Sequence, residues 1–393
     1  MKRYKLSELI EIKNGRDHKD LPNGEYPVLG SGGIMRYVNA FLYDKPSILL
    51  PRKGTLSNIQ YCEKPFWTVD TLYYTAVNEK IACPYYLYRY LRLLDMSGLD
   101  TGTGVPSMTF SSYYNIEVWL PCVEEQRRIA SVLQVLDAKI ELNRQINDNL
   151  EAMAKQLYDY WFVQFDFPNE EGKPYKSSGG AMVWNEKLKR EIPKGWHCGT
   201  LLDIAEYTNG LACQKYRPTD EKKLPVIKIK EMHDGLSVDT EWVKADIPDN
   251  VKVFDGDVLF SWSASLEVML WAYGNGGLNQ HIFKVTSKNG YPRSFYFYQL
   301  VHYIGVFKQM AEARKTTMGH ITQNHLRQST IVLPPDVDIA NKLEEKLCPI
   351  FDAIVKNSQE IMTLTKQRDE LLPLLMNGQA SVNYHLSIFY TKH

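Results

Sequence analysis

Residues 124–161 read EEQRRIASVLQVLDAKIELNRQINDNLEAMAKQLYDYW, and this stretch decides the fold. One row at every seventh position is apolar apart from a single asparagine, and it consists of Ile129, Leu136, Asn143, Leu150 and Leu157. An apolar seam with this period predicts a long helix that pairs with a second helix. At a rise of about 1.5 Å per residue the helix would span roughly 55 Å, which suits a spacer better than a core helix.

A second helix with the same pattern is expected in the C-terminal half. Its row consists of Leu343, Ile350, Asn357, Leu364 and Leu371, each 214 residues after its counterpart. A lone polar residue in such a seam usually fixes the register, so we expect Asn143 and Asn357 to pair with one another. The alternative is that each is a solvated residue on a bundle helix. Pro349 and Pro373 should kink or end this helix, which would then begin in earnest at Ile350.

The segments that precede the two helices repeat as well. The echoed pairs are 6–15 with 202–210, 27–29 with 225–227, 47–50 with 257–260, the aromatic stretches 85–94 and 295–307, the Thr-rich loops 101–109 and 314–322, and strands that end at Pro121 and Pro334. This order predicts an α+β fold, with two pseudo-symmetric mixed α/β domains separated by two long, paired coiled-coil spacer helices. The expected boundaries are 1–121 for the first domain, 122–164 for the first spacer helix, 165–195 for a linker, 196–334 for the second domain, 335–378 for the second spacer helix and 379–393 for a tail.

The composition indicates a folded protein without a membrane span or a disulfide framework. Lys and Arg total 46, as do Asp and Glu, and a net charge of zero argues against nucleic-acid binding unless a basic face is hidden in the total. The six cysteines show no CxxC spacing and no signal peptide precedes them, so we expect reduced, mostly buried thiols in a cytoplasmic protein. No apolar stretch approaches the roughly 20 residues that a membrane span needs.

The sequence carries no motif for catalysis. Its only Pro-Pro, at 334–335, lacks the Asn or Asp and the aromatic residue with which a methyltransferase grips a base amino group, and no phosphate-binding GxxxxGK[ST] occurs. His320 and His325 lie five residues apart without a cysteine partner, so we interpret them as surface groups rather than zinc ligands. The sequence therefore predicts binding without catalysis, with no metal site.

The centre of the chain resembles a known protein family. Residues 161–186 read WFVQFDFPNEEGKPYKSSGGAMVWNE and residues 191–196 read EIPKGW, and together they look like the central connector of the specificity (S) subunits of type I restriction-modification systems. The Leu-Pro at 120–121 with Glu125-Gln126 is similar to the start of the family's first spacer helix. Residues 371–378, LLPLLMNG, are similar to the end of the second, although residues 334–340, PPDVDIA, depart from its usual start.

The resemblance implies a non-catalytic subunit that recognises a DNA sequence. Each half would be a target recognition domain that reads one part of a bipartite, asymmetric site in double-stranded DNA, and the helices would set the length of the unread gap. Two modification (methyltransferase) subunits would dock along the helices, and restriction subunits would join them. S-adenosylmethionine, ATP and Mg²⁺ would be used by those partners, with no cofactor bound by this chain.

The expected DNA contacts are loops that combine flexible backbone with cations and amides, because base edges need donors and acceptors and phosphates need cations. The candidates are Arg36, Arg52, Lys53 and Asn58 in the first domain and Lys228, Lys230, Gln280, His281, Arg314, Lys315, Thr316 and His320 in the second. For each residue alone, a solvated surface group is the competing interpretation. Differences between the two sets are expected if each domain reads a different half-site.

Two other functions stay open at this point. The partner could be one polypeptide that fuses methyltransferase and nuclease activities, in which case this chain would look the same. Alternatively, the chain could be a non-catalytic coiled-coil scaffold or regulator that binds DNA without any methyltransferase.

Overall fold

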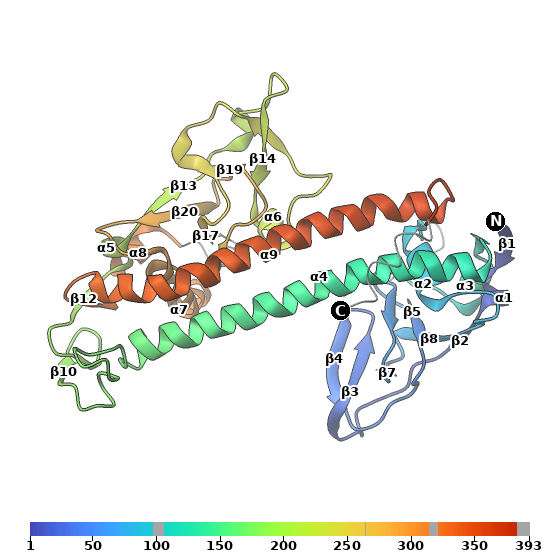
Figure 1. Ribbon diagram of the computed structural model, residues 1–393, viewed down its shortest axis with the longest axis horizontal. Coiled ribbons are helices and arrows are strands. Elements are labelled where there is room, and N and C mark those ends of the chain that lie inside the picture. Colours follow the sequence, from blue (N-terminus) through green and yellow to red (C-terminus); the bar gives the residue numbers. More distant parts are fainter. Residues whose placement is uncertain (97–105, 264, 314–320, 383–393) are drawn as a thin grey trace. The chain divides into compact units, whose positions relative to one another are not determined.

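The structure, a computed structural model, describes residues 1–96, 106–263, 265–313 and 321–382 (Figure 1). Its contacts divide the chain into two units. Unit 1 comprises Met1–Ala138 and Thr365–His393, and unit 2 comprises Lys139–Leu364. The boundary between the units falls within each of the two long helices. Each unit therefore contains a segment of both helices.

Unit 1 contains short helices and three small sheets. Its strands are β1 (Lys2–Lys5), β2 (Ile10–Lys13), β3 (Asn23–Gly30), β4 (Gly33–Val38), β5 (Ser47–Pro51), β6 (Gln60–Cys62), β7 (Trp67–Thr68), β8 (Leu72–Val77) and β9 (Glu117–Leu120). Its short helices are α1 (Leu6–Leu9), α2 (Pro84–Leu93) and α3 (Phe110–Tyr114). The strand orders are β1-β9, β2-β8-β5-β6 and β4-β3-β7.

Unit 2 contains the connector and a second set of sheets. Its strands are β10 (Met182–Asn185), β11 (Arg190–Pro193), β12 (His197–Gly199), β13 (Ala205–Asn209), β14 (Lys223–Ile227), β15 (Trp242–Lys244), β16 (Lys252–Val253), β17 (Val258–Ser261), β18 (Glu267–Leu270), β19 (Gly276–Leu278), β20 (Ile282–Ser287) and β21 (Ile331–Leu333). Besides the long helices it contains α5 (Leu201–Ile204), α6 (Ile229–Asp234), α7 (Arg293–Ala313) and α8 (Gln323–Gln328), with a π-helical turn at Asp159–Val163 and 3-10 turns at Cys213–Lys215 and Asp249–Val251. The strand orders are β10-β11, β12-β21, β13-β20-β17-β18 and β15-β14-β19-β16.

The two units repeat one topology, which confirms the internal repeat and the fold class predicted from the sequence. The pair β1-β9 corresponds to β12-β21, and the sheet β2-β8-β5-β6 corresponds to β13-β20-β17-β18. In the remaining sheets β3 pairs antiparallel with β4 and parallel with β7, as β14 does with β15 and β19. Among the described residues of unit 1, no strand corresponds to β16.

The strands β5 and β17 form where the chain is most continuously apolar. Every residue of Ser47–Pro51 and of Val258–Ser261 is buried, because each strand lies between two others in its sheet and is covered on both faces. β5 ends directly before Arg52, and β17 ends directly before Trp262. The two central strands therefore deliver matching loops to matching places in the two units.

The long helices are α4 (Val123–Tyr158) and α9 (Asp338–Met376). The extent of α4 agrees with the first predicted spacer helix. α9 likewise lies within the predicted 335–378, but the expectation that Pro349 would delay its start to Ile350 was wrong, because α9 begins at Asp338 and continues through Pro349. Pro349 is exposed, whereas Leu347 and Phe351 beside it are buried, so packing outweighs the loss of the one backbone hydrogen bond that proline cannot donate.

Within unit 2, α4 and α9 run antiparallel. Asn143 Nδ2 donates to Glu360 Oε2 at 2.9 Å. Asn147 Nδ2 donates to the Ile354 carbonyl at 3.2 Å and to Ser358 Oγ at 3.0 Å. Residue numbers thus rise along α4 as they fall along α9, and these bonds form a polar layer between the helices.

The predicted bond between Asn143 and Asn357 was therefore wrong. Asn357 Nδ2 donates instead to Oδ1 of Asn147, at 3.0 Å. The prediction considered one row of the α4 seam, whereas a second row at every seventh position is also buried: Gln126, Leu133, Ile140, Asn147 and Ala154. This second row has its own asparagine, and that asparagine is the partner of Asn357.

Most of the predicted seam residues lie on packed faces. Ile129, Asn143, Leu343 and Leu364 are buried, Leu136, Leu150, Leu157, Ile350 and Asn357 are half-buried, and Leu371 is exposed. An α-helix drifts by about 20° per heptad relative to a strict seven-residue repeat. Over four heptads from Leu343 this drift moves Leu371 out of the seam, and Leu372 takes the buried position.

Each unit has its own main hydrophobic core, to which both long helices contribute. In unit 1, Leu50 and Tyr86 pack with Leu133 of α4 and Leu375 of α9. In unit 2, the corresponding core contains Phe260 and Phe295 of the domain, Ala154 of α4 and Phe351 of α9. The helix pair is therefore built into both domains and is not a free coiled coil.

The segment predicted as a linker, 165–195, is folded onto unit 2. Phe165 and Phe167 are buried, and their ring centroids lie 5.6 and 5.1 Å from that of Trp196. Asp166 accepts a hydrogen bond from the backbone N–H of Ser177 at 2.7 Å. The prolines and glycines of this segment therefore belong to its turns, while its aromatic residues pack against Trp196 and attach it to unit 2.

Candidate nucleic-acid interface

In unit 1, the loops after the central strands meet in one place, which we call the first loop cluster (residues 14–19, 30–35, 51–58, 68–71 and 106–108). The Arg16 N–H donates to the Thr68 carbonyl at 2.8 Å, and the Arg52 N–H donates to the Thr71 carbonyl at 2.9 Å. The Met108 N–H donates to the Arg52 carbonyl at 3.0 Å. Backbone hydrogen bonds between neighbouring loops thus fix this cluster.

Unit 2 builds the same arrangement, the second loop cluster (residues 209–217, 228–230, 261–263, 279–281 and 321). The Leu211 N–H donates to the Leu278 carbonyl at 2.8 Å, and the Trp262 N–H donates to the His281 carbonyl at 3.3 Å. The Ile321 N–H donates to the Trp262 carbonyl at 3.0 Å. These three bonds join the loops in the same way as the three bonds of the first cluster.

One glycine in each cluster permits the close approach of two loops. A Cβ added at Gly15 would lie 2.0 Å from the Val69 carbonyl oxygen, and one added at Gly210 would lie 2.2 Å from the Asn279 carbonyl oxygen. No side chain fits at such distances, so both positions need glycine. Each glycine follows an asparagine in the sequence.

The predicted DNA contacts of unit 1 lie together in or beside the first loop cluster. Asn58 Nδ2 donates to the Ser31 carbonyl at 2.6 Å and so ties two of the predicted loops to one another. Lys53 is exposed, and Arg52 is half-buried with Nη1 3.4 Å from the Asp70 carbonyl. Lys53 can therefore turn toward a phosphate, and Arg52 can give up its one long hydrogen bond to reach a base edge.

Arg36 has a different role from the one predicted. Its Nη2 donates to the Leu21 carbonyl at 2.9 Å and to Asn23 Oδ1 at 2.8 Å, so the guanidinium braces the segment that leads into β3. An arginine that would have to break two such bonds is a poor first choice for a DNA contact. This role could not be predicted from the sequence, because the tertiary fold brings Leu21 and Asn23, before and at the start of β3, next to Arg36 on β4.

The predicted lysines of unit 2 are paired with carboxylates. Lys228 Nζ lies 2.6 Å from Glu241 Oε1, and the pKa of the Glu241 carboxyl is lowered by this hydrogen bond and charge. Lys230 Nζ lies 3.8 Å from Asp239 Oδ2 and is more than half exposed, so it is the freer of the two cations. Lys230 is therefore the stronger candidate for a phosphate contact.

Gln280 and His281 lie at the centre of the second loop cluster. Gln280 Nε2 and His281 Nε2 are 3.3 Å apart, and the imidazole lies 5.6 Å from the Trp262 ring, centroid to centroid. The Trp262 indole N–H donates to Asn209 Oδ1 at 3.0 Å. An amide, an imidazole and an indole thus meet on one rigid loop platform, a set of donors and acceptors suited to base edges.

Four other predicted contacts, Arg314, Lys315, Thr316 and His320, lie outside the described residues. His325 is described, and it corrects the interpretation of this histidine as a surface group. It is buried, and its Nδ1 accepts a hydrogen bond from the Thr322 N–H at 3.0 Å at the start of α8. A capping role of this kind is set by the helix start, which the spacing of two histidines could not indicate.

Sequence reasoning missed the exposed polar residues that flank the two glycines. Asn14, Arg16 and Asn209 are exposed within the loop clusters, as are Lys215 and Arg217 in the loop that follows Gly210. The signal was present, since Asn-Gly closes both copies of the first echoed segment. The repeat of Asn-Gly was used only as evidence of the internal repeat and not as a marker of the interface.

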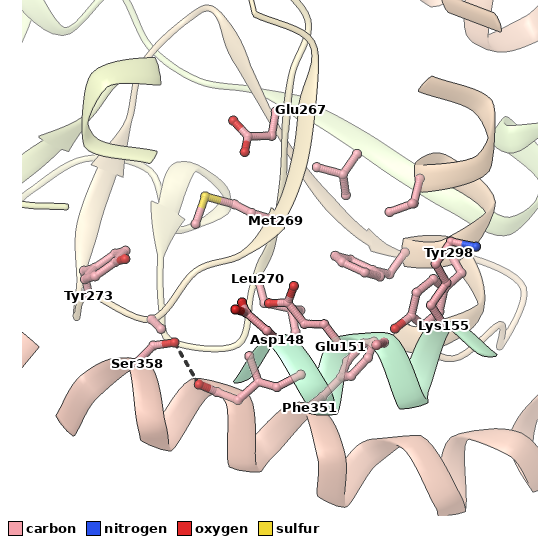
Figure 2. A pocket seen from close by; sticks show the side chains of 16 residues that line it. Asp148, Glu151, Lys155, Glu267, Met269, Leu270, Tyr273, Tyr298, Phe351 and Ser358 are labelled. Atoms are coloured by element: carbon pink, nitrogen blue, oxygen red, sulfur yellow. Dashed lines mark hydrogen bonds between the residues drawn. The ribbon is translucent and has the colours of Figure 1, made fainter. Parts of the chain in front are cut away.

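A groove of about 630 Å³ lies in unit 2 between α4, α7, α9 and β18 (Figure 2). Leu270, Phe351 and Met269 contribute to its apolar lining, while Asp148 and Glu151 bring carboxylates from α4. Desolvation in the groove and the neighbouring Asp148 raise the pKa of the Glu151 carboxyl. Glu267 adds a third carboxylate, and Lys155, the cation of the lining, is paired with Asp159, so the groove repels phosphates and suits a protein partner rather than DNA.

In unit 1, side chains fill the space that corresponds to the groove of unit 2. Tyr61 of β6 lies opposite Ile48 just as Leu270 of β18 lies opposite Val258, so Tyr61 and Leu270 hold equivalent positions. Tyr61 stacks on Tyr88 with ring centroids 5.3 Å apart. The ring of Tyr61 thus occupies space in unit 1 that the smaller Leu270 leaves open in unit 2.

Other features of the described residues bear on chemistry. No group of three or more His, Cys, Asp or Glu among them is placed to hold a metal ion. The six cysteines are free thiols, but only Cys213 is buried and Cys122 is exposed, which corrects the expectation that most are buried. Within the described ranges, no helix has the length and apolar character of a membrane span.

The sequence pattern of the family described as type I restriction modification DNA specificity domain matches residues 1–152 and 193–367. The specificity subunit of the type I restriction enzyme MjaIX from Methanocaldococcus jannaschii is 26% identical over 389 residues, which cover 93% of this chain and 86% of that protein. The HindI specificity subunit from Haemophilus influenzae is 24% identical over 337 residues, covering 70% of this chain and 71% of that protein.

A solved structure shows the same fold. The crystal structure of a type I restriction-modification system S subunit from M. genitalium aligns with a TM-score of 0.63 at 16% sequence identity, over 95% of each chain. The family pattern covers most of both repeats, together with parts of both long helices. The chain therefore belongs to the type I restriction-modification DNA specificity family.

Proposed function

We propose that the chain reads a split, asymmetric site in double-stranded DNA, with each loop cluster reading one half. The observation that carries this proposal is that the two clusters share backbone hydrogen bonds but differ in side chains. Arg52 and Thr71 in unit 1 occupy the places of Trp262 and His281 in unit 2. Equal scaffolds with different donors and acceptors are what two unlike half-sites require.

Membership of the family supports the partners that we infer for the chain. Two modification subunits dock along the two related helices, and restriction subunits join through them. In this arrangement S-adenosylmethionine, ATP and Mg²⁺ are bound and used by the partner subunits, and this chain contributes recognition and no catalytic step. The helix pair sets the number of unread base pairs between the half-sites.

The proposal is tested by methylome sequencing of cells that co-express the chain with its cognate modification subunit. We expect adenine methylation at one split sequence. Arg52→Ala should relax selectivity in one half of that sequence, and His281→Ala should relax it in the other half. A contiguous site, or a change in both halves from either substitution, would contradict the proposal. Binding without methylation by any candidate partner would favour a scaffold.

The groove of unit 2 supports docking of a modification subunit through a segment that joins an apolar anchor to a basic side chain. The apolar lining suits the anchor, and Asp148 and Glu151 provide the complementary charge. Glu151→Lys should weaken binding of the purified modification subunit by more than tenfold. Glu186→Lys makes the same charge change on the exposed β10–β11 turn and should leave binding unchanged. Equal effects of the two substitutions would exclude the groove.

A further inference from the structure

Two large apolar side chains are displayed at the tip of the β3–β4 hairpin. Ile34 is 57% exposed and Met35 is 59% exposed, although both lie within strand β4. Exposing adjacent large apolar residues forgoes the stabilisation that burial would give. A pair of such residues on a hairpin tip therefore points to a binding surface.

The backbone of β4 is shaped to present this pair. Val28 pairs with Arg36 while the next residue, Leu29, pairs with Ile34, so Met35 is an extra residue without a partner on β3. An extra residue of this kind is a β-bulge, which bends the strand and re-aims the side chains beside it. This bulge lies at the hairpin tip, and a second irregularity of register, between Asn23 and Tyr26, lies at the base of the hairpin.

The hairpin tip belongs to the first loop cluster. Asn58 Nδ2 donates to the Ser31 carbonyl at 2.6 Å, and Gln60 Nε2 donates to the Gly30 carbonyl at 2.9 Å. These bonds hold the turn before Ile34 against the loop that carries Lys53. The apolar pair is thus fixed beside exposed cations and amides, which is the mixed chemistry of a surface that meets a DNA groove.

We propose that Ile34 and Met35 read thymine in the half-site of the first domain by contacting its 5-methyl group in the major groove. The thymine methyl is the apolar feature of base edges there, and an apolar side chain that covers it gains hydrophobic free energy that cytosine does not offer. The exposed Lys53 beside the pair supplies the charge complementarity to phosphate that a protein partner would not require. The inference rests on the proposed DNA-reading function and adds a specific base contact to it.

Unit 2 offers a matched control in the corresponding connection between β14 and β15. Val238 in this connection is 99% exposed, so a substitution there removes an apolar surface group without disturbing a core. Val238→Ser should leave recognition by unit 1 intact. Ile34→Ser and Met35→Gln are likewise substitutions of exposed residues, and they replace apolar groups with polar ones.

The experiment measures the affinity of the complex with the modification subunit for duplexes that carry its methylome-defined site. Each thymine of the site is replaced in turn by deoxyuridine, which lacks only the methyl group. We expect at least one thymine in one half-site at which this replacement weakens wild-type binding about fourfold, the effect of one buried methyl group. In Ile34→Ser or Met35→Gln the same replacement should cause no further loss, while Val238→Ser should keep the wild-type loss.

Two results would overturn the inference. One is a site in which no thymine is sensitive to the replacement in the wild type. The other is that deoxyuridine weakens DNA binding by both hairpin variants as much as it weakens binding by the wild type. If these variants also bind the modification subunit more weakly, the hairpin tip is a protein contact instead. Either result leaves the proposed DNA-reading function standing as long as the split site is methylated, so the two failures are distinguishable.

Discussion

At the scale of single residues, the Asp137 carboxylate is central to the stability of unit 1. Its carboxylate accepts hydrogen bonds from Arg89 and Tyr85 of α2, and from Arg368 Nη1 of α9 at 3.0 Å. Arg89 is 5% exposed, so its charge depends on this one partner. The carboxylate joins the domain to both long helices.

Removing this carboxylate should destabilise unit 1 strongly. Asp137→Ala leaves the buried Arg89 guanidinium without a counter-charge, whereas Arg368 keeps its ion pair with Asp369, and we expect a loss of about 3 kcal/mol in the free energy of unfolding. Glu370→Gln is the control, because the Lys366–Glu370 pair on α9 is exposed and should contribute less than about 0.5 kcal/mol. Urea unfolding of the two variants checks this, and equal losses would contradict it.

The glycines of the loop clusters make a second prediction at this scale. Gly210→Ala would place a methyl group against the Asn279 carbonyl, so the second loop cluster must open, and recognition of its half-site should be lost. Gly305→Ala, on α7 outside both loop clusters and with open space around the added methyl group, should leave recognition unchanged. Methylation of variant half-sites reports both results. A Gly210→Ala protein with wild-type selectivity would show that the cluster is not the reading surface.

At the scale of elements, the helix pair depends on its polar layer. Asn147 is buried and accepts a hydrogen bond from the half-buried Asn357, so Asn147→Leu leaves the Asn357 amide without this partner and should cost about 1 kcal/mol. Asn147→Leu combined with Asn357→Leu should recover much of this loss, because both ends of the bond become apolar. Thermal unfolding of the two single variants and the double variant measures the coupling. Additive effects would show that the two residues do not interact.

The same layer makes the helix pair sensitive to acid. Hydrogen bonds from Lys139 and Asn143 lower the pKa of the Glu360 carboxyl. A carboxyl whose pKa is lower in the folded state stabilises the fold above its unfolded pKa, and this contribution is lost as the pH falls through the folded value. The wild type should therefore exceed Glu360→Gln in stability at neutral pH, with a difference that shrinks below about pH 4. A constant difference across this range would contradict the assignment.

Some of these elements could be predicted from the sequence, and others could not. Heptad spacing predicted both long helices because apolar periodicity is local, and the echoed segments predicted the repeated sheets. The second seam row escaped notice because Gln126, Asn147 and Ala154 are not large apolar residues. The roles of Arg36 and Lys228 could not be foreseen, since their partners Leu21, Asn23 and Glu241 are brought to them by the tertiary fold.

At the scale of the whole molecule, the repeated architecture gives the two domains one way of reading DNA and one way of joining the helices. Residues of α4 and α9 are buried in the core of each unit, so a change in helix length is transmitted to both domains. On our proposal, the helix pair sets the unread gap, and the loop clusters set the half-site sequences. These two properties should therefore change independently.

The most direct test of this account is methylome sequencing after removal of the facing heptads 140–146 and 357–363 from α4 and α9. Seven residues of helix correspond to about 10 Å, or about three base pairs of DNA. We expect both half-site sequences to stay the same while the unread gap shortens by about three base pairs. An unchanged gap, or altered half-sites, would contradict the claim that the helices space two independent reading domains.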